Sequence, residues 1–224
     1  GSIDPVRDIE IVEFELQVKD LEQIEKKITK VEKAAKVGEK EAKKMLEILL
    51  KYKNHLENFQ NIRTLDVTPE EKAAVADMML LTDKPVMFVC NVNEADAVNG
   101  NAYVEQVKAA LAQTGDEILF IAGKMEAEIA ELQSEEDRAE FLADAGLTVP
   151  GVNKVIQTAY KMLNFISFFT VGGKENRAWT IKKGTLAPQA AGVIHSDLER
   201  GFIRAEVIKY DDLIRYGSEL KCKE

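Results

Sequence analysis

The sequence predicts an α/β protein with α+β character in three parts: an antiparallel helical arm, part of a parallel α/β sheet, and a small β-grasp module. Three observations predict this. Apolar residues recur every three or four positions near the N-terminus, apolar strands alternate with amphipathic helices in the middle, and a strand, hairpin, helix and strand follow near the C-terminus. We place the three parts at 1–67, 68–163 and 164–224.

The first part predicts two long helices joined by a short turn. The first helix carries one apolar stripe, formed by Ile11, Phe14, Val18, Leu21, Ile24, Ile28 and Val31. A turn at Val37 and Gly38 separates it from a second, charge-rich helix over 39–59, so we expect an antiparallel hairpin. Such a hairpin serves either as a solvated structural arm or as a docking arm for a partner, and the periodicity does not separate these readings.

The middle part begins with a helix start at Thr68, an N-cap residue followed by proline and two acidic residues. Residues 85–90 then form an almost wholly apolar run, as expected of a parallel strand covered on both faces, and 116–123 predict a second buried strand. Because ligands bind beyond the carboxyl ends of parallel strands, 91–94 and 123–126 are the candidate binding segments.

The last part predicts a compact mixed module. A helix from Gly151 runs into a strand over 166–171, and a second strand and turn cover 177–185. A helix start and a short connection then lead to a further strand over 203–208. This order within about 55 residues is that of a small β-grasp fold.

Composition and charge restrict the class of protein. With 46% hydrophobic and 31% charged residues the chain should fold, and its two cysteines are too few for a disulfide framework. No signal peptide and no apolar run of about 20 residues is present, so we expect a cytoplasmic protein with no membrane partner. The net charge of −9 argues against indiscriminate binding to the nucleic-acid backbone, and we expect no sequence-specific DNA partner. Residues 172–224 carry 10 basic against 8 acidic residues and leave room for a localised contact.

Three stretches carry a family resemblance: IDPVRDIEIVEFELQVKDLEQIEKK, KPVMFVCNVNEAD and FFTVGGKENRAWTIKKGTLAPQAAGVIHSDLERGFIRAEVIKYDDLIRYGS. In this order they resemble the start of the coiled-coil arm, the base-recognition turn and the C-terminal TGS domain of the YchF proteins, the Obg-like ATPases among the TRAFAC P-loop NTPases. The resemblance covers essentially the whole chain. The resemblance implies a P-loop nucleotide-binding domain with an inserted helical arm, a ubiquitin-like TGS domain, hydrolysis of ATP or GTP with Mg, and association with the ribosome or its RNA.

The phosphate-binding part of such a protein is missing from this sequence. A Walker A loop needs G-x-x-x-x-G-K-[ST], and the nearest lookalike, Gly172-Gly173-Lys174, is followed by Glu175. The resemblance places the phosphate loop and switch regions before Ile3 and the last TGS strands after the final residues. We therefore expect a fragment truncated at both ends, with no catalytic residue or metal ligand and no hydrolase activity of its own. The alternative is a ribosome-binding, RNA-binding or coiled-coil interaction module without hydrolase activity.

The polar turn Asn91, Val92, Asn93 and Glu94 is the main candidate for a base-binding site. Relatives that read guanine use N-K-x-D at this place. Val92 removes the lysine stem that would lie along the base, and Glu94 moves the carboxylate outward by one methylene, so guanine specificity should weaken. The amide of Asn91 suits the N6/N7 edge of adenine, and the family resemblance also implies an adenine preference. Asn91 as a simple turn former is the alternative.

The segment GKMEAE, with Gly123 and Lys124 at its start, resembles the second base-side loop of the family. Glycine permits close approach of the backbone to a ligand. Ala122-Gly123 departs from the Ser-Ala common in the family, and the alternative is that Gly123 ends a strand while Met125 packs in the core.

A second candidate surface combines an aromatic residue with basic neighbours on one strand of the β-grasp module. Its members are Arg177, Trp179, Lys182 and Lys183. Such a set would suit stacking of RNA bases, although Trp179 serves equally well as a core residue. We interpret His195 as a structural hydrogen-bonding residue, His55 as solvated, and Cys90 as a strand residue rather than a redox sensor.

Overall fold

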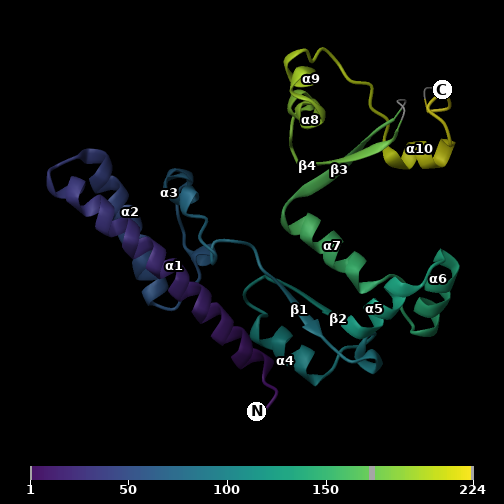
Figure 1. The fold of residues 1–224 in the computed structure, drawn as a ribbon, viewed down its shortest axis with the longest axis horizontal. Helices are drawn as coiled ribbons and strands as arrows, with labels where there is room; N and C mark the ends of the chain where they lie inside the picture. Colours follow the sequence, from purple (N-terminus) through teal and green to yellow (C-terminus); the bar gives the residue numbers. More distant parts are fainter. Residues whose placement is uncertain (1, 172–174, 223–224) are drawn as a thin grey trace. The chain divides into compact units, whose positions relative to one another are not determined.

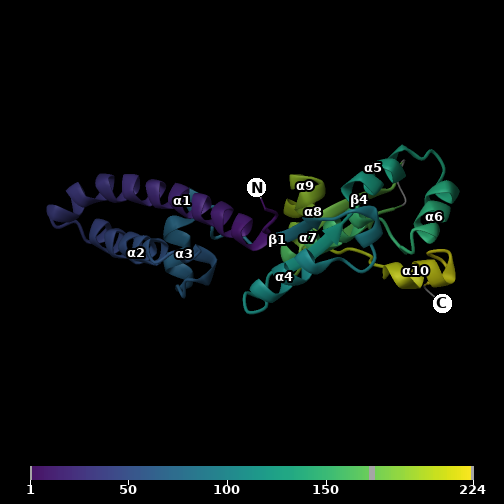
Figure 2. The ribbon, with the colours of Figure 1, turned by 90° about the horizontal axis from the view of Figure 1, so that it is seen from below.

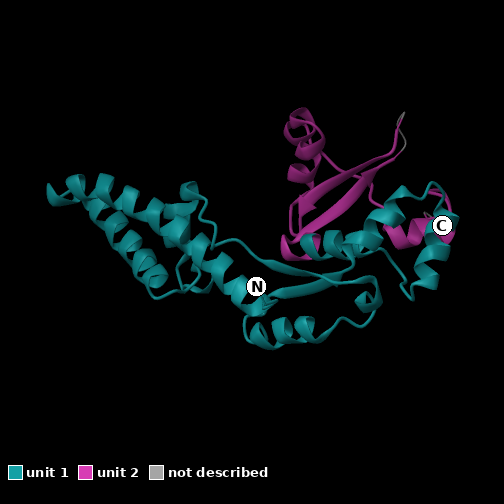
Figure 3. Cartoon of the chain, turned by 60° about the horizontal axis from the view of Figure 1, so that its bottom comes forward, with its two compact units in different colours: residues 1–159 teal, residues 160–224 magenta. Residues whose placement is uncertain are grey.

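The computed structural model describes residues 2–171 and 175–222. The chain divides into two compact units, Gly1–Ala159 and Tyr160–Glu224, which Figure 3 shows in different colours. The Walker A lookalike at 172–174 lies outside the described residues. No helix in the described part of the chain is both long enough and apolar enough to cross a membrane.

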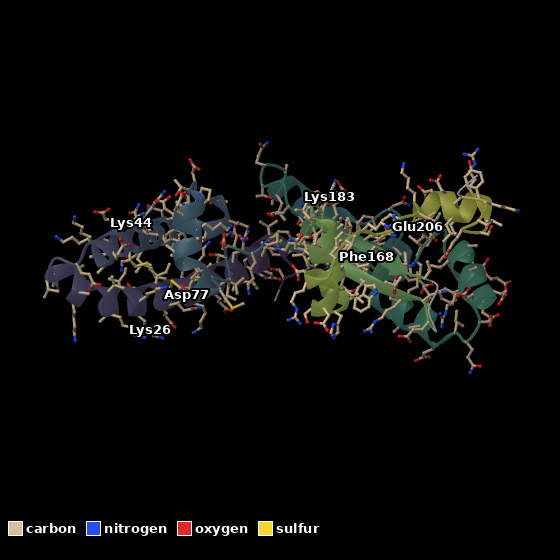
Figure 4. All side chains as sticks on the ribbon, turned by 90° about the horizontal axis from the view of Figure 1, so that it is seen from above. Lys26, Lys44, Asp77, Phe168, Lys183 and Glu206 are labelled. Atoms are coloured by element: carbon tan, nitrogen blue, oxygen red, sulfur yellow. The ribbon has the colours of Figure 1, made fainter. Side chains whose placement is uncertain are left out.

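Unit 1 begins with a helical hairpin. Helix α1 covers Pro5–Lys36 and α2 covers Lys40–Glu57, and they lie side by side and antiparallel in Figures 1 and 2. Asp4 caps α1 by accepting a hydrogen bond from the Arg7 N–H at 3.1 Å. Figure 4 labels Lys26 and Lys44 on this hairpin, and both are exposed. The predicted pair of helices is confirmed.

The core of the hairpin is closed by the segment that follows it. Its buried side chains are Ile24, Ile28, Ile48, Leu49, Tyr52, Leu56, Ile62, Val75 and Leu80. The later members come from the 3₁₀ helix η1 (Ile62–Thr64), from α3 (Pro69–Val75) and from the stretch after the 3₁₀ helix η2 (Ala76–Met78). Thr68 starts α3 with a capping box shared with Glu71, as the sequence predicted for this helix start.

The apolar stripe of α1 is only partly buried. Ile24 and Ile28 lie in the core, whereas Ile11, Phe14 and Val18 are between a third and a half exposed. Helix α1 has 32 residues and α2 only 18, so α2 covers only one end of α1. The predicted stripe is therefore buried only in its later part, and its first three members are exposed.

Two polar residues of α1 are buried and hold the helix to later segments of unit 1. Asp20 is fully buried, and its carboxylate accepts hydrogen bonds from Leu81 N, Thr82 N and Thr82 Oγ1, each at 2.7 Å. Gln17 is also buried and donates to Asn61 Oδ1 at 2.8 Å. These bonds fix the middle of α1 to the chain after α2 and to the segment that leads into β1.

The sheet of unit 1 contains two parallel strands, β1 (Met87–Asn91) and β2 (Glu117–Ile121), paired from Met87 with Glu117 to Asn91 with Ile121. Around them lie the 3₁₀ helix η3 (Glu94–Asp96) and the helices α4 (Ala102–Ala110), α5 (Gly123–Glu131) and α6 (Glu135–Asp144). The parallel α/β arrangement is confirmed. The expectation that β1 is covered on both faces is wrong, because Val89 is 42% exposed. Within the described residues, only β2 pairs with this strand.

Helix α7 (Gly151–Met162) carries the chain from unit 1 into unit 2. Unit 2 holds an antiparallel pair, β3 (Phe165–Thr170) and β4 (Arg177–Lys182), followed by α8 (Ala187–Ile194), α9 (Ser196–Arg200) and α10 (Tyr210–Tyr216). The strand predicted over 203–208 is absent. This segment has no strand partner among the described residues, and Ile203 and Val207 are 91% and 83% exposed.

Candidate base-binding site

The two candidate binding segments of the sheet are joined by a hydrogen bond. Asn91 is the last residue of β1, and its side-chain Oδ1 accepts a hydrogen bond from the Gly123 N–H at 3.0 Å. Gly123 is the first residue of α5, directly after the end of β2. Parallel pairing in register places the two strand ends at the same edge of the sheet.

The Asn91 side chain leaves little space for a larger residue at Gly123. A Cβ atom at this position would lie 3.0 Å from Asn91 Oδ1, which is tighter than an ordinary van der Waals contact. The glycine therefore permits the backbone to approach the Asn91 amide. The packing of Met125 expected in the alternative interpretation is confirmed, because Met125 is 2% exposed and lies in a core cluster, whereas Gly123 begins α5 instead of ending β2.

The Gly123 bond orients the Asn91 amide. Because a backbone N–H is a donor, the atom that faces it must be the oxygen, and Nδ2 then points the other way with two donor hydrogens. A donor at this edge suits a ring acceptor such as purine N7, which adenine and guanine share. A donor at this position would by itself not distinguish adenine from guanine.

The rest of the turn divides between core and solvent. Val92 packs against a cluster formed by Ala97, Ala122, Met125, Ile129 and Leu142. Its backbone N–H donates to Ile121 O at 2.9 Å, which continues the pairing with β2. The Val92 side chain therefore anchors the turn, and only its backbone is available beside Asn91.

Asn93 and Glu94 face solvent. Asn93 precedes η3, and Glu94 is its first residue. In the described part of the chain no ion pair holds the Glu94 carboxylate, so it can accept hydrogen bonds from a ligand. Lys124, the remaining predicted member, has a side chain that is 92% exposed and lies 3.8 Å from Glu128. The structure thus brings Asn91 and Gly123 into contact and leaves Glu94 and Lys124 exposed.

The sequence placed Glu126 in a candidate binding segment but did not predict its contact with α7. Glu126 lies three residues after Gly123 on α5, and its Oε1 accepts a hydrogen bond from the Gly151 N–H at 2.6 Å. The partner lies 25 residues further along the chain, and no local pattern points to it.

A cleft of unit 1 lies apart from the polar turn 91–94. An open apolar cleft of about 370 Å³ lies between α1 and β1, lined by residues such as Ile9, Val12, Phe88 and Cys90. It does not include the polar turn, and its chemistry offers few hydrogen-bonding groups to a base. Burial raises the pKa of the Cys90 thiol, and nearby Lys108 opposes this more weakly, so Cys90 stays protonated at neutral pH. This supports the interpretation of Cys90 as a strand residue.

The predicted RNA-contact residues do not share one face of their sheet. Arg177 and Trp179 lie two residues apart on one face of β4, whereas Lys182 has the opposite parity and Lys183 follows the strand. The Arg177 guanidinium lies over the Trp179 ring, 4.5 Å from its centroid, and Trp179 Nε1 donates to Thr170 Oγ1 at 3.1 Å. Trp179 is half-buried. Figure 4 labels Phe168, which pairs with Trp179, and Lys183.

The two histidines hold local structure. His195 caps α9, because its Nδ1 accepts a hydrogen bond from the Asp197 N–H at 3.1 Å, which confirms its structural interpretation. His55 is half-buried, and its Nε2 lies 3.0 Å from Asn61 O and 2.9 Å from Thr64 Oγ1. The expectation of a solvated His55 is wrong, because the chain after α2 folds back over its ring.

Comparisons with known proteins bear on the whole chain. The family YchF-GTPase_C, described as a protein of unknown function (DUF933), matches residues 165–224. The chain is 46% identical over 224 residues to the ribosome-binding ATPase YchF of Escherichia coli O157:H7 and 41% identical over 226 residues to that of Bacillus subtilis (strain 168). Both alignments cover all of this chain. The whole chain matches part of the YchF proteins.

A solved YchF structure has the same fold. The Schizosaccharomyces pombe YchF GTPase matches all of this chain with a TM-score of 0.87 at 35% sequence identity. The chain spans 61% of the E. coli relative and 61% of the S. pombe chain. The names of these relatives differ in the nucleotide, since two are called ATPases and one a GTPase.

Proposed function

We propose that this chain supplies the base-binding half of a YchF-type protein that hydrolyses ATP, or GTP, and associates with the ribosome in the cytoplasm. The observation that carries the proposal is the bond between Asn91 Oδ1 and Gly123 N, which joins the two base-side segments and turns Nδ2 outward. In this proposal the α1–α2 hairpin is the coiled-coil arm, 68–163 belong to the P-loop domain, and 164–224 form the TGS domain.

The base edge suggests how the nucleotide would be held. Asn91 Nδ2 would donate to purine N7, the backbone at Gly123 would lie against the ring, and Val92, Asn93 and Glu94 would form the near wall. A carboxylate repels the N1 acceptor of adenine, so Glu94 would serve adenine only by accepting from the exocyclic N6 amine. Lys124 is exposed and would lie along the base or ribose. We expect adenine to bind more tightly than guanine.

Magnesium enters this proposal only together with the nucleotide phosphates. Within residues 2–171 and 175–222, no group of three His, Cys, Asp or Glu side chains is placed to hold a metal ion. The residues present therefore do not form a magnesium site, and no role for the ion is derived from them.

The test compares nucleosides with nucleotides on this chain. Adenosine and ATP should bind with similar, weak affinity, because no stretch of the sequence fits a Walker A loop and only the base half is present. A version extended to the length of the relatives should bind ATP tightly with Mg. Asn91→Ala should abolish adenosine binding and Asn99→Ala, an exposed asparagine of the same loop, should not. Tight Mg-dependent ATP binding by the 224-residue chain would contradict the proposal.

A second candidate function is direct contact of unit 2 with ribosomal RNA. The observation that favours it is the stack of Arg177 on Trp179 in a strand that ends at the exposed Lys182 and is followed by the exposed Lys183. Stacking residues flanked by cations bind single-stranded RNA in a salt-dependent way. Co-sedimentation with ribosomes at two salt concentrations is the measurement, and binding that does not weaken at the higher salt would count against an RNA contact.

A further inference from the structure

The start of α7 is held by one carboxylate. Glu126 Oε1 accepts from the Gly151 N–H at 2.6 Å, and its Oε2 lies 3.3 Å from the Val152 N–H. The first N–H groups of a helix have no partner within the helix and carry partial positive charge, so a carboxylate is a favourable partner for them. Glu126 therefore ties α5 to α7.

The close approach at this point is built into the sequence. A Cβ on Gly151 would lie 2.7 Å from Glu126 Oε1 and 2.7 Å from Ile121 Cγ2, the last residue of β2. No side chain fits there without a shift of its neighbours. The first turn of α7 is thus pressed between the end of β2 and the first turn of α5.

The other end of the same turn of α5 holds the base-binding turn. Gly123 donates its N–H to Asn91, and Glu126 lies three residues later on the same helix. Three residues of α-helix rise about 4.5 Å and form a nearly complete turn, with no flexible segment between them. Asn91, Gly123, Glu126 and Gly151 therefore form one continuous series of contacts.

We propose that Glu126 is a positioning residue for the base site: by holding the first turn of α5 against α7, it keeps the Gly123 N–H on Asn91 and the Asn91 Nδ2 turned outward. This inference rests on the proposed function for its ligand. Coupling is reciprocal, so a base bound at Asn91 would in turn strengthen the Glu126 contact with Gly151 and Val152. Because Glu126 contacts the first two residues of α7, the start of this helix would report whether the base site is filled.

A purely structural cap would not be sensitive to Asn91. The first experiment therefore needs no ligand: amide hydrogen exchange at Gly151 and Val152 is compared between the wild-type chain and Asn91→Ala. We expect exchange at both amides to rise at least about fivefold, the lower end of typical couplings between sites. Asn101→Ala is the matched control, because it removes the same side chain from the cap of α4 and should leave Gly151 unchanged. Unchanged exchange in Asn91→Ala would overturn the coupling.

The second experiment adds adenosine and follows the amide resonances of Gly123 and Gly151 together. In the wild-type chain both should shift along one binding curve. Glu126→Ala should weaken adenosine binding by at least about fivefold, and Glu126→Gln, which keeps an acceptor oxygen, should fall between it and the wild type.

The outcomes separate the two proposals. If no amide from Asn91 to Glu94 or at Gly123 responds to adenosine or guanosine, the base-site proposal fails, and the exchange experiment still decides whether Asn91 and Glu126 are coupled. If Gly123 responds while Gly151 does not, and Glu126→Ala binds adenosine as well as the wild type, the base site stands and the role of Glu126 is overturned.

Discussion

Two glycines occupy positions where the neighbouring side chains leave almost no space. At Gly123 the neighbour is the exposed Asn91 amide, which can move by a few tenths of an ångström. At Gly151 the neighbours are a bound carboxylate and a methyl group at the end of β2, and both are held in place. The two positions should therefore differ in their tolerance of alanine, although both begin a helix.

Gly151→Ala should lower the free energy of unfolding by about 1–3 kcal/mol, the usual cost of forcing atoms into a packed site. Alanine is the better helix former, so a local propensity effect would have the opposite sign. Urea unfolding followed by far-ultraviolet circular dichroism measures the change. Asn153→Ala, at an exposed position of the same helix, should change stability by less than about 0.5 kcal/mol. Stabilisation by Gly151→Ala would show that the contact at this glycine is easily relieved.

Asp20 is the buried residue whose change should cost most for its size. Asp20→Asn would place an amide NH₂ against one or more of the three donors from Leu81 and Thr82, and we expect a loss of at least about 2 kcal/mol of stability. Glu32→Gln makes the same chemical change in an exposed pair with Lys36 and should cost less than about 0.5 kcal/mol. Equal effects in urea unfolding would contradict the structural role of Asp20.

At the scale of elements, the ion pairs that join the hairpin to α3 and η2 predict an acid-sensitive contact. The Thr68 N–H lowers the pKa of Glu71, with a smaller contribution from Lys51, and the hydrogen bond from Lys27 lowers the pKa of Asp77. A carboxyl group whose pKa is lower in the folded state stabilises that state above its unfolded pKa, about 4.3 for Glu and 3.9 for Asp. This contribution is lost as the pH falls through the folded-state values.

Glu71→Gln should lower the melting temperature at neutral pH and flatten its fall between about pH 6 and about pH 3, because the variant has no proton to take up at this position. Thermal unfolding over this pH range is the measurement. Lys51→Met removes the weaker of the two causes and keeps the Thr68 bond, so it should flatten the curve less than Glu71→Gln. If Lys51→Met flattened the curve more than Glu71→Gln, the ion pair with Lys51, and not the Thr68 bond, would be the main cause of the lowered pKa of Glu71.

The elements of this fold could be predicted where their pattern is local. The paired helices, the start of α3 at Thr68 and the parallel strands that end at Asn91 and Ile121 follow from periodicity, capping and turn chemistry. Burial of Asp20 could not be predicted, because its partners are backbone N–H groups about 60 residues away. The prediction of a strand over 203–208 was wrong for a related reason. A strand needs a neighbouring strand to pair with, and the local sequence does not predict whether one is present.

The candidate site was predictable to the same degree. Asn91 and Gly123 were found because strand ends are where ligands bind, and their hydrogen bond confirms that the two ends meet. The inward packing of Val92 was not predicted, since a valine in a polar turn looks exposed until its neighbours Ala97 and Ala122 are placed.

At the scale of the whole molecule, charge is divided between the two units. Residues 1–159 carry 19 basic and 31 acidic side chains, whereas 160–224 carry 11 basic and 8 acidic ones. An acidic unit 1 is repelled by a polyanion, so any attraction to RNA must come from particular basic positions rather than from net charge. The exposed lysines of unit 2 and those of the arm are the two candidates.

Lys182→Glu with Lys183→Glu should weaken co-sedimentation with ribosomes and lower the slope of log affinity against log salt by about one to two, as expected for the loss of two phosphate contacts. Lys26→Glu with Lys44→Glu makes the same change in charge on the helical hairpin and is the matched control (Figure 4). A large effect of the control pair and none of the first would assign the ribosome contact to the hairpin.

Trp179 is the single tryptophan of the sequence, and it lies in β4 of unit 2 beneath the Arg177 guanidinium. Intrinsic tryptophan emission from this chain is therefore an optical signal of unit 2 alone. Loss of the Thr170 bond and the Arg177 stack on unfolding should change the Trp179 emission. Melting of the hairpin or of the base-binding turn should leave this emission unchanged. Emission and circular dichroism followed in the same sample would thus show separately when each unit loses its structure.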